Sequence, residues 1–279
     1  MLIRCWGARG SIPVSGPEYL KYGGDTTCIE IRTRGGDIVI IDAGSGIRRL
    51  GGMLMREGQK TFSLLFTHAH WDHLLGFPFF KPIYCESTRI TIYGCAYMED
   101  SVKSIISPTM KPPNFPVHYE DISARIAYHD SCGTNFKIGS LQIFSIPLSH
   151  PNQGVGYKFV EDGRSMVFLT DNELGHRHEG GLGPDDYADF SKGADLLIHD
   201  AEYSRDVYRE RITWGHSSYE DALALAIRAG VKKLGLIHHN QESSDDKIDS
   251  FMEDCGRLIR ESGAALSCFP LYQGWELEL

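Results

Sequence analysis

A short buried strand that runs directly into a cluster of metal-binding side chains is the feature that most restricts the fold of this chain. Residues 62–67 form an apolar run typical of a buried strand, and His68-Ala-His70-Trp-Asp72-His73 follows it without a break. In extended chain, residues two apart point to the same side, so His68 and His70 can bind one ion. Asp72 and His73 follow where the chain must turn, and they can reach a neighbouring ion. The cluster therefore predicts a two-metal site at a strand end.

The alternative interpretation is a chance group of polar residues on the surface. Histidine accounts for 12 of the 279 residues, so three histidines and an acid within six positions are improbable from composition alone. We therefore favour metal binding over a chance cluster.

Further metal-binding side chains follow other expected strands. His150 comes after the strand expected at 141–146, Asp171 ends the strand at 166–170, and His238 ends the strand at 233–237. Imidazole nitrogens and carboxylate oxygens are standard zinc ligands, and imidazole also suits iron. A carboxylate such as Asp171 can bridge two ions.

The pattern of strands and helices indicates two sheets with helices outside. Strands are also expected at 27–33, 37–42, 154–160 and 194–200, with hairpin turns at Gly35-Gly36 and Asp162-Gly163. One helix is expected to begin at a capping box, Ser217–Glu220, and to end at Gly230, and a second is expected from Ser244 to Gly263. One mixed sheet covered by helices is the simpler alternative. We favour a two-sheet sandwich because strand-rich stretches fill both halves.

Residues 81–135 have a weaker pattern and contain proline-rich turns. We expect one domain over 1–279 with an insertion at about 81–135, which carries a strand at 89–93 and a short helix near 98–106. The insertion is expected to cover the mouth of the metal site.

Charge and cysteine content limit the cellular setting. The net charge of −9 disfavours indiscriminate binding to nucleic acid or anionic membrane, although a local basic patch remains compatible with it. No apolar run approaches the roughly 20 residues that span a bilayer, and the first residues lack a signal-peptide pattern. Seven scattered cysteines without a Cys-x-x-Cys pair suit reduced thiols, so we expect a cytoplasmic protein with no membrane contact.

The metal-binding pattern resembles the metallo-β-lactamase-fold hydrolase superfamily over nearly the whole chain. This resemblance implies an α+β protein with an αβ/βα four-layer sandwich, in which two mixed β-sheets are flanked by helices. It implies two divalent ions, of which zinc is expected, while manganese or iron would also suit the ligands. It assigns the first ion to His68, His70 and His150, the second to Asp72, His73 and His238, the bridge to Asp171, and a structural role to Asp42.

Two later segments are similar to the ribonuclease Z and phosphodiesterase branch of that superfamily. They are His199-Asp-Ala-Glu-Tyr203 and His216-Ser-Ser218. The resemblance implies that Asp200 and His216 form a pair near the leaving group, so Asp72, Asp200 and His216 are the expected catalytic residues. The absence of a cysteine near Asp171 disfavours antibiotic hydrolysis, because the β-lactamases of this fold carry cysteine there.

The expected function is hydrolysis of a small or nucleotide-derived phosphodiester, such as a cyclic nucleotide, by a dinuclear centre with a bridging hydroxide. Ribonuclease Z carries a long arm that grips transfer RNA, whereas here Asp200 lies only 29 positions after Asp171. The short spacing and the negative charge argue for a small-molecule partner and against transfer RNA. Two alternatives stay open: a lactone or thioester hydrolase on the same metals, and a non-catalytic metal-binding sensor. A homodimer also stays open.

Overall fold

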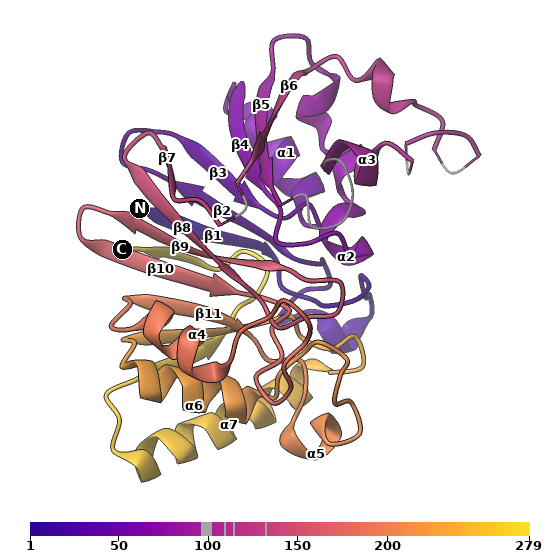
Figure 1. The fold of residues 1–279 in the computed structure, drawn as a ribbon. Coiled ribbons are helices and arrows are strands. Elements are labelled where there is room, and N and C mark those ends of the chain that lie inside the picture. Colours follow the sequence, from indigo (N-terminus) through magenta and orange to yellow (C-terminus); the bar gives the residue numbers. More distant parts are fainter. Residues whose placement is uncertain (96–101, 109, 114, 132) are drawn as a thin grey trace.

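Two seven-stranded sheets packed face to face form the centre of this computed structural model, which describes residues 1–95, 102–108, 110–113, 115–131 and 133–279 (Figure 1). The first sheet has the strand order β14 (Glu276–Glu278), β1 (Leu2–Gly7), β2 (Cys28–Arg32), β3 (Ile38–Ile41), β4 (Thr61–Leu65), β5 (Arg89–Gly94), β6 (Arg125–Asp130). The second has the order β13 (Ser267–Pro270), β12 (Lys233–Ile237), β11 (Leu196–Asp200), β10 (Arg164–Leu169), β9 (Val155–Glu161), β8 (Leu141–Pro147), β7 (Phe136–Ile138).

The two sheets repeat one pattern of strand direction. In the first, β14, β1, β2 and β3 are successively antiparallel, and β3 to β6 are parallel. In the second, β7 to β10 are antiparallel, and β10 to β13 are parallel. Both sheets are therefore mixed, as predicted.

Helices cover the outer face of each sheet and complete four layers (Figure 1). The helices over the first sheet and at its end are α1 (Ile47–Arg56), α2 (Trp71–Leu74), α3 (Val102–Ile106) and the 3₁₀ turns η2 (Phe77–Phe79), η3 (Lys81–Tyr84) and η4 (Tyr119–Asp121). Those on the second-sheet side are α4 (Pro184–Ser191), α5 (Arg205–Tyr208), α6 (Tyr219–Ala229) and α7 (Asp245–Ser262), and η1 (Pro17–Tyr19) contacts α7. The predicted αβ/βα sandwich is confirmed.

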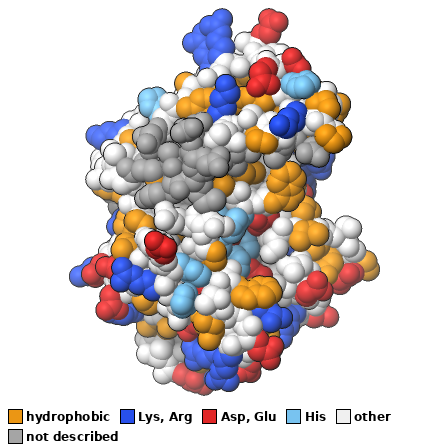
Figure 2. All heavy atoms as spheres, turned by 45° about the vertical axis from the view of Figure 1, so that its right-hand side comes forward, with side chains coloured by type: hydrophobic (Ala, Val, Ile, Leu, Met, Phe, Trp, Pro, Cys, Tyr) orange, Lys and Arg blue, Asp and Glu red, His pale blue; other side chains and the backbone are white. Residues whose placement is uncertain are grey.

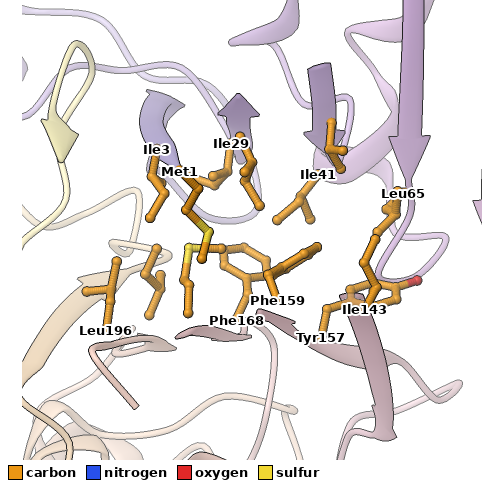
Figure 3. Close-up of a cluster of buried hydrophobic side chains, with 14 of the residues drawn as sticks. Met1, Ile3, Ile29, Ile41, Leu65, Ile143, Tyr157, Phe159, Phe168 and Leu196 are labelled. Atoms are coloured by element: carbon orange, nitrogen blue, oxygen red, sulfur yellow. The ribbon is translucent and has the colours of Figure 1, made fainter. Parts of the chain in front are cut away.

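The central strand β3 is apolar throughout because it is buried on both faces. In β3, Val39 and Ile41 point into the core between the sheets, while Ile38 and Ile40 pack against the helices. Figure 3 shows the core between the sheets, with Ile41 and other side chains of the first sheet facing Phe168 and other side chains of the second. This core holds the two sheets, and hence their strand ends, in one fixed arrangement.

Most predicted elements are present, and one helix start is corrected. Gly230 and Gly263 end α6 and α7 in the left-handed conformation, as predicted. The predicted capping box at Ser217 is wrong by one residue, because Ser218 is the N-cap and accepts a hydrogen bond from the Asp221 amide. Ser217 instead donates its hydroxyl to the Asn172 carbonyl at 2.6 Å.

The segment 81–135 contributes strands to the first sheet. The predicted strand is β5, and β6 extends the sheet beyond it. The predicted helix is present from Val102, whereas residues 98–101 of that prediction lie outside the described residues. The covering of the metal site by this segment, the insertion and the single domain over 1–279 stay predictions.

Cysteine pairing differs from the expectation at one position. Cys95 is disulfide-bonded, so the expectation that all seven thiols are reduced is wrong there. Among the described helices, none combines the length and hydropathy that a membrane span requires.

Candidate metal centre

The carboxyl ends of several strands meet at one edge of the sandwich. β3 and β4 are parallel, as are β10, β11 and β12, and β8 runs in the direction of β10 because both are antiparallel to β9. Six side chains end these strands or follow them within three residues: Asp42, His68, His150, Asp171, Asp200 and His238. The core between the sheets therefore brings residues that are up to 196 positions apart to one place.

The first expected ligand set is assembled around Asp171. His68, His70, His150 and Asp171 offer ligand atoms that all lie within 4.8 Å of one another. His68 Nε2 is 3.5 Å from Asp171 Oδ2, and His150 Nε2 is 3.0 Å from His70 Nδ1. Three imidazoles and one carboxylate thus surround a single point.

The second expected set shares the same carboxylate. Asp72, His73, His238 and Asp171 again have ligand atoms within 4.8 Å of one another. His238 Nε2 is 3.2 Å from Asp72 Oδ2 and 3.3 Å from Asp171 Oδ2. His73 Nε2 is 3.3 Å from both Asp72 Oδ2 and Asp171 Oδ1. Asp171 accordingly lies between the two sets.

Three of these strand-end residues have a left-handed backbone. The φ angles of Asp42, Asp171 and His238 are 62°, 54° and 63°. Each such residue costs about 1–3 kcal/mol, and positions of this kind cluster at functional sites. The strain turns the side chains away from the strand direction and into the cluster.

The donor atoms fit divalent cations. His68 Nε2 and His73 Nε2 are buried without a hydrogen-bond partner, and both face Asp171. A buried ring nitrogen without a partner costs free energy unless an ion or water satisfies it. A mixed set of imidazole nitrogens and carboxylate oxygens suits zinc, manganese or iron.

Hydrogen bonds on the far side of each ring fix its orientation. His73 Nδ1 is 2.8 Å from Asp42 Oδ2, His238 Nδ1 is 3.0 Å from Glu202 Oε2, and His150 Nδ1 donates to the Gly215 carbonyl at 2.9 Å. These contacts hold a proton on Nδ1 and leave Nε2 facing the cluster. Asp42 lies beside the site, where it was expected.

Burial and charge set the protonation of the ligands. Burial lowers the pKa of His150 to about 3, and it lowers the pKa of His68 well below the usual range, so both rings are neutral. Burial also opposes a charge on His73, but Asp72 and Asp171 outweigh it and raise the pKa of His73 well above its usual value. A proton on this ring and a bound cation compete for the same lone pair, so metal binding releases protons.

Asp200 and His216 form the expected pair at the rim of the cluster. His216 Nδ1 is 2.7 Å from Asp200 Oδ2, so the aspartate reaches the ring directly. His216 Nε2 is 3.3 Å from Glu202 Oε2. Burial lowers the pKa of His216, but Glu202 and Asp200 more than compensate and raise it to about 9, which favours the cationic ring. Asp200 and His216 also group with Asp171 and His238 as possible metal ligands, so the pair adjoins the second set.

Sequence reasoning missed several supporting contacts. Glu202 is buried and contacts His216, His238 and Asn240, although its sequence position left it as a supporting or surface residue. The Ser11 amide donates to Asp72 Oδ2 at 2.9 Å from a loop near the amino terminus. No local sequence pattern predicts these contacts, because each joins residues from distant parts of the chain.

Histidines outside the two sets have other contacts. His239 is buried and its Nε2 is 2.8 Å from the Leu271 carbonyl oxygen. His178 Nε2 is 2.7 Å from Glu173 Oε2, and its ring packs edge-on against His176. Among the described residues, His176 and His178 belong to none of the potential ligand groups.

The metal cluster opens to one face of the molecule. Figure 2 shows histidine side chains gathered in a hollow near the middle of that face. His70 is partly exposed and the His216 side chain keeps 11% exposure, whereas His73 is fully buried. A substrate can therefore approach from this side.

A separate groove of about 680 Å³ runs beside α1 and carries positive charge. Arg48, Arg49, Arg56 and Lys81 line it, together with aromatic side chains such as Phe79, which is half exposed. None of the four cations forms an ion pair with a described residue. The groove is thus a local basic patch on a chain of net charge −9.

Comparison with known proteins supports the fold and the class of hydrolase. The model of the beta-lactamase superfamily domain matches residues 38–239. Ribonuclease Z from Thermococcus kodakarensis is 26% identical over 267 residues, which cover 80% of this chain and 82% of that protein. A metallo-beta-lactamase fold protein from Bacillus subtilis superposes with a TM-score of 0.73 at 17% identity, covering 100% of this chain and 99% of the other. The short form of human tRNase Z superposes with a TM-score of 0.65 at 19% identity, with coverage of 100% and 99%.

These similarities correct the expectation about the substrate. The prediction of a small-molecule partner, with transfer RNA as an unlikely one, is wrong, because it conflicts with similarity to ribonuclease Z over most of the chain. The physical error lies in the use of net charge, which averages over the whole surface. The groove beside α1 shows that positive charge can be concentrated locally.

Proposed function

The chain belongs to the beta-lactamase superfamily, and on that premise we propose that it is a metal-dependent phosphodiesterase that cleaves RNA. One observation carries the proposal: seven nitrogen and oxygen ligands and a buried aspartate–histidine pair converge at one edge of the sandwich. Ligands alone are compatible with many hydrolytic reactions. The adjacent pair favours a reaction whose leaving group needs a proton.

In the proposed centre, each ion is held by three residues of its own and by the shared Asp171. The first would be held by His68, His70 and His150. The second would be held by Asp72, His73 and His238. When bound, two divalent cations offset the negative charge of the phosphodiester and lower the pKa of a water molecule positioned for attack. Zinc is the proposed ion, and the donor set also accommodates manganese or iron.

The proposed proton donor is His216. An alkoxide leaving group is strongly basic, so a group that protonates it as the bond breaks accelerates cleavage. Asp200 accepts from Nδ1 of the ring at 2.7 Å and thereby fixes the ring's orientation, with Nε2 as the nitrogen that would donate the proton. Glu202 stabilises the same cationic ring from its Nε2 side. Asp72 is proposed as a metal ligand. The Ser11 amide donates a hydrogen bond to Asp72 Oδ2 and thereby fixes the orientation of this carboxylate.

RNA is the proposed substrate class for two reasons. The curated relatives that match most of the chain are named ribonuclease Z. In addition, the groove beside α1 is lined by four cations to which phosphate groups can bind and by exposed aromatic side chains. The first RNA to test is an unprocessed transfer-RNA transcript.

The test uses protein loaded with Zn²⁺ or Mn²⁺, with the metal content measured before the assay. We expect cleavage of the transfer-RNA transcript and of bis(p-nitrophenyl) phosphate, loss of both activities with a chelator, and recovery when metal is returned. Asp171→Ala is the matched inactive control because it removes the shared ligand. Metal-loaded protein that cleaves neither phosphodiester contradicts the proposal. Turnover of lactones or thioesters alone would favour the carbonyl-hydrolase alternative.

A further inference from the structure

A cleft of about 750 Å³ adjoins the metal centre on the side of His216. Its wall includes Ser11, Glu202 and His216, which contact the metal-site residues described above. Its outer part is lined by Trp214, Arg211 and Lys247, among others. The volume lies within the range of about 300–1,000 Å³ that is usual for sites of small organic ligands. The cleft is therefore large enough for one nucleoside beside the reacting phosphate.

Trp214 presents a large aromatic surface in this cleft. Its side chain is 57% exposed, although the Arg211 guanidinium lies over the ring at 4.7 Å from the ring centroid. Val207, which also lines the cleft, is 43% exposed. An indole ring that is left in water forgoes a substantial hydrophobic gain, and tryptophan in such a position is typical of binding surfaces.

The turn that carries Trp214 is held rigidly. On either side of it, the Thr213 amide donates to Glu173 Oε1 at 2.8 Å and the Gly215 amide donates to Glu173 Oε2 at 2.7 Å. Glu173 is buried, and it also accepts from the Tyr208 hydroxyl at 2.8 Å.

Strain in the same turn points to a functional position. Thr213 has a φ of 77°, which is a genuine outlier for a β-branched residue and costs of the order of 1–3 kcal/mol. The Gly215 carbonyl in turn accepts from the metal-site residue His150. Gly215, the residue after Trp214, therefore links the turn to the metal-site residue His150. The indole itself stays exposed.

We infer that this cleft binds the nucleobase on the leaving side of the scissile phosphate, stacked on Trp214. The inference rests on the proposed function, because His216 is the proton donor for the leaving oxygen and also forms part of the cleft wall. Stacking suits any base, because every base has an aromatic face. Arg211 and Lys247 add two positive charges to the lining and the exposed Glu242 adds one negative charge, while the buried Glu202 is already bonded to His238 and Asn240. The outer part of the lining therefore keeps a net positive charge for the phosphate that follows the base.

The test measures binding rather than turnover, with a pair of probes that differ only in the base. Adenosine 5′-monophosphate and ribose 5-phosphate are titrated calorimetrically into the zinc-loaded protein. Stacking on one aromatic side chain corresponds to a preference of about 5- to 150-fold for the probe that carries the base. We expect Trp214→Ala to abolish this preference and Trp214→Phe to retain most of it. Tyr272→Ala is the matched control, because Tyr272 is a partly exposed aromatic residue that lies outside the cleft.

The outcomes separate this inference from the proposed function. A wild-type protein without the preference, or a Trp214→Ala variant that keeps it, overturns the inference even if RNA is cleaved. With an RNA substrate, Trp214→Ala should raise KM and leave kcat nearly unchanged, and an unchanged KM also overturns it. Zinc-loaded protein that cleaves no phosphodiester refutes the proposed function, and with it the leaving-side assignment.

Discussion

Replacement of His216 by alanine tests the assignment of a proton donor through the choice of leaving group. In RNA the leaving group is an alkoxide, which needs a proton as the bond breaks. In bis(p-nitrophenyl) phosphate it is a phenolate that leaves readily without one. A positioned general acid contributes about 10²- to 10⁴-fold to the rate. His216→Ala should therefore lower kcat on RNA by about that factor and change turnover of the aryl ester little.

The structure also predicts the behaviour of the neighbouring residue. Asp200 Oδ2 accepts from His216 Nδ1 at 2.7 Å, and the bond is buried and charge-assisted. A charge-assisted hydrogen bond is about twice as strong as a neutral one. Asp200→Asn should thus give the same selectivity for RNA with a smaller loss than His216→Ala.

The assay compares initial rates on both substrates at equal metal content. Metal analysis of each variant is essential, because His216 and Asp200 belong to a third possible ligand group with Asp171 and His238. Equal losses on RNA and on the aryl ester, at full metal occupancy, would refute the role of His216 as proton donor. A loss of bound metal in His216→Ala would identify it as a ligand instead.

Three further predictions concern metal binding and RNA binding. Glu202→Gln removes the negative charge that orients the His238 ring. Zinc affinity, measured by chelator-competition titration, should fall by about 10- to 100-fold. An unchanged affinity would contradict the role of Glu202 in orienting this ligand. Gly10→Ala would place a methyl group 2.2 Å from the His238 ring and displace this ligand. Elemental analysis should then find one bound ion per chain in place of two, and two retained ions would show that the ring can move. A double substitution, Arg49→Ala with Arg56→Ala, should weaken the dependence of RNA affinity on salt. The slope of the logarithm of the binding constant against the logarithm of the salt concentration should fall in magnitude by about 0.7 for each lost phosphate contact. An identical slope would exclude the groove as the RNA contact.

Local sequence predicted the part of the site that lies on one strand end. His68, His70, Asp72 and His73 were identified because strand alternation and a following turn restrict where adjacent side chains can point. His150, Asp171 and His238 were candidate ligands because each follows or ends an expected strand. Their assignment to the two ions came from the family resemblance, since no local rule groups residues so far apart. The pairing of β1 with β14 was not predicted either, since it joins the two ends of the chain and no local pattern relates them.

Residues that support the site were harder to predict than its ligands. Glu173 looks like an ordinary surface acid in the sequence, and the position of Glu202 leaves it as either a supporting or a surface residue. Both are buried, and each has several hydrogen-bond partners. A buried carboxylate is recognised only when its partners are known, and those partners come from other elements. The distribution of charge on the surface is hard to predict for the same reason. Arg48 and Lys81 line one groove only because α1 packs beside η3.

The division of the ligands between the two sheets has a consequence for how the centre forms. The first sheet leads into His68 and His73, the second provides His150 and His238, and each ligand set contains residues from both. Neither sheet alone holds a complete set, so the core between the sheets must form before either ion can bind fully. Any ion that binds only the folded sandwich then stabilises it by mass action, by about 2.7 kcal/mol when free metal is 100 times its dissociation constant. The strained backbone at Asp171 and His238 opposes folding, and metal binding offsets that strain at the point where it arises.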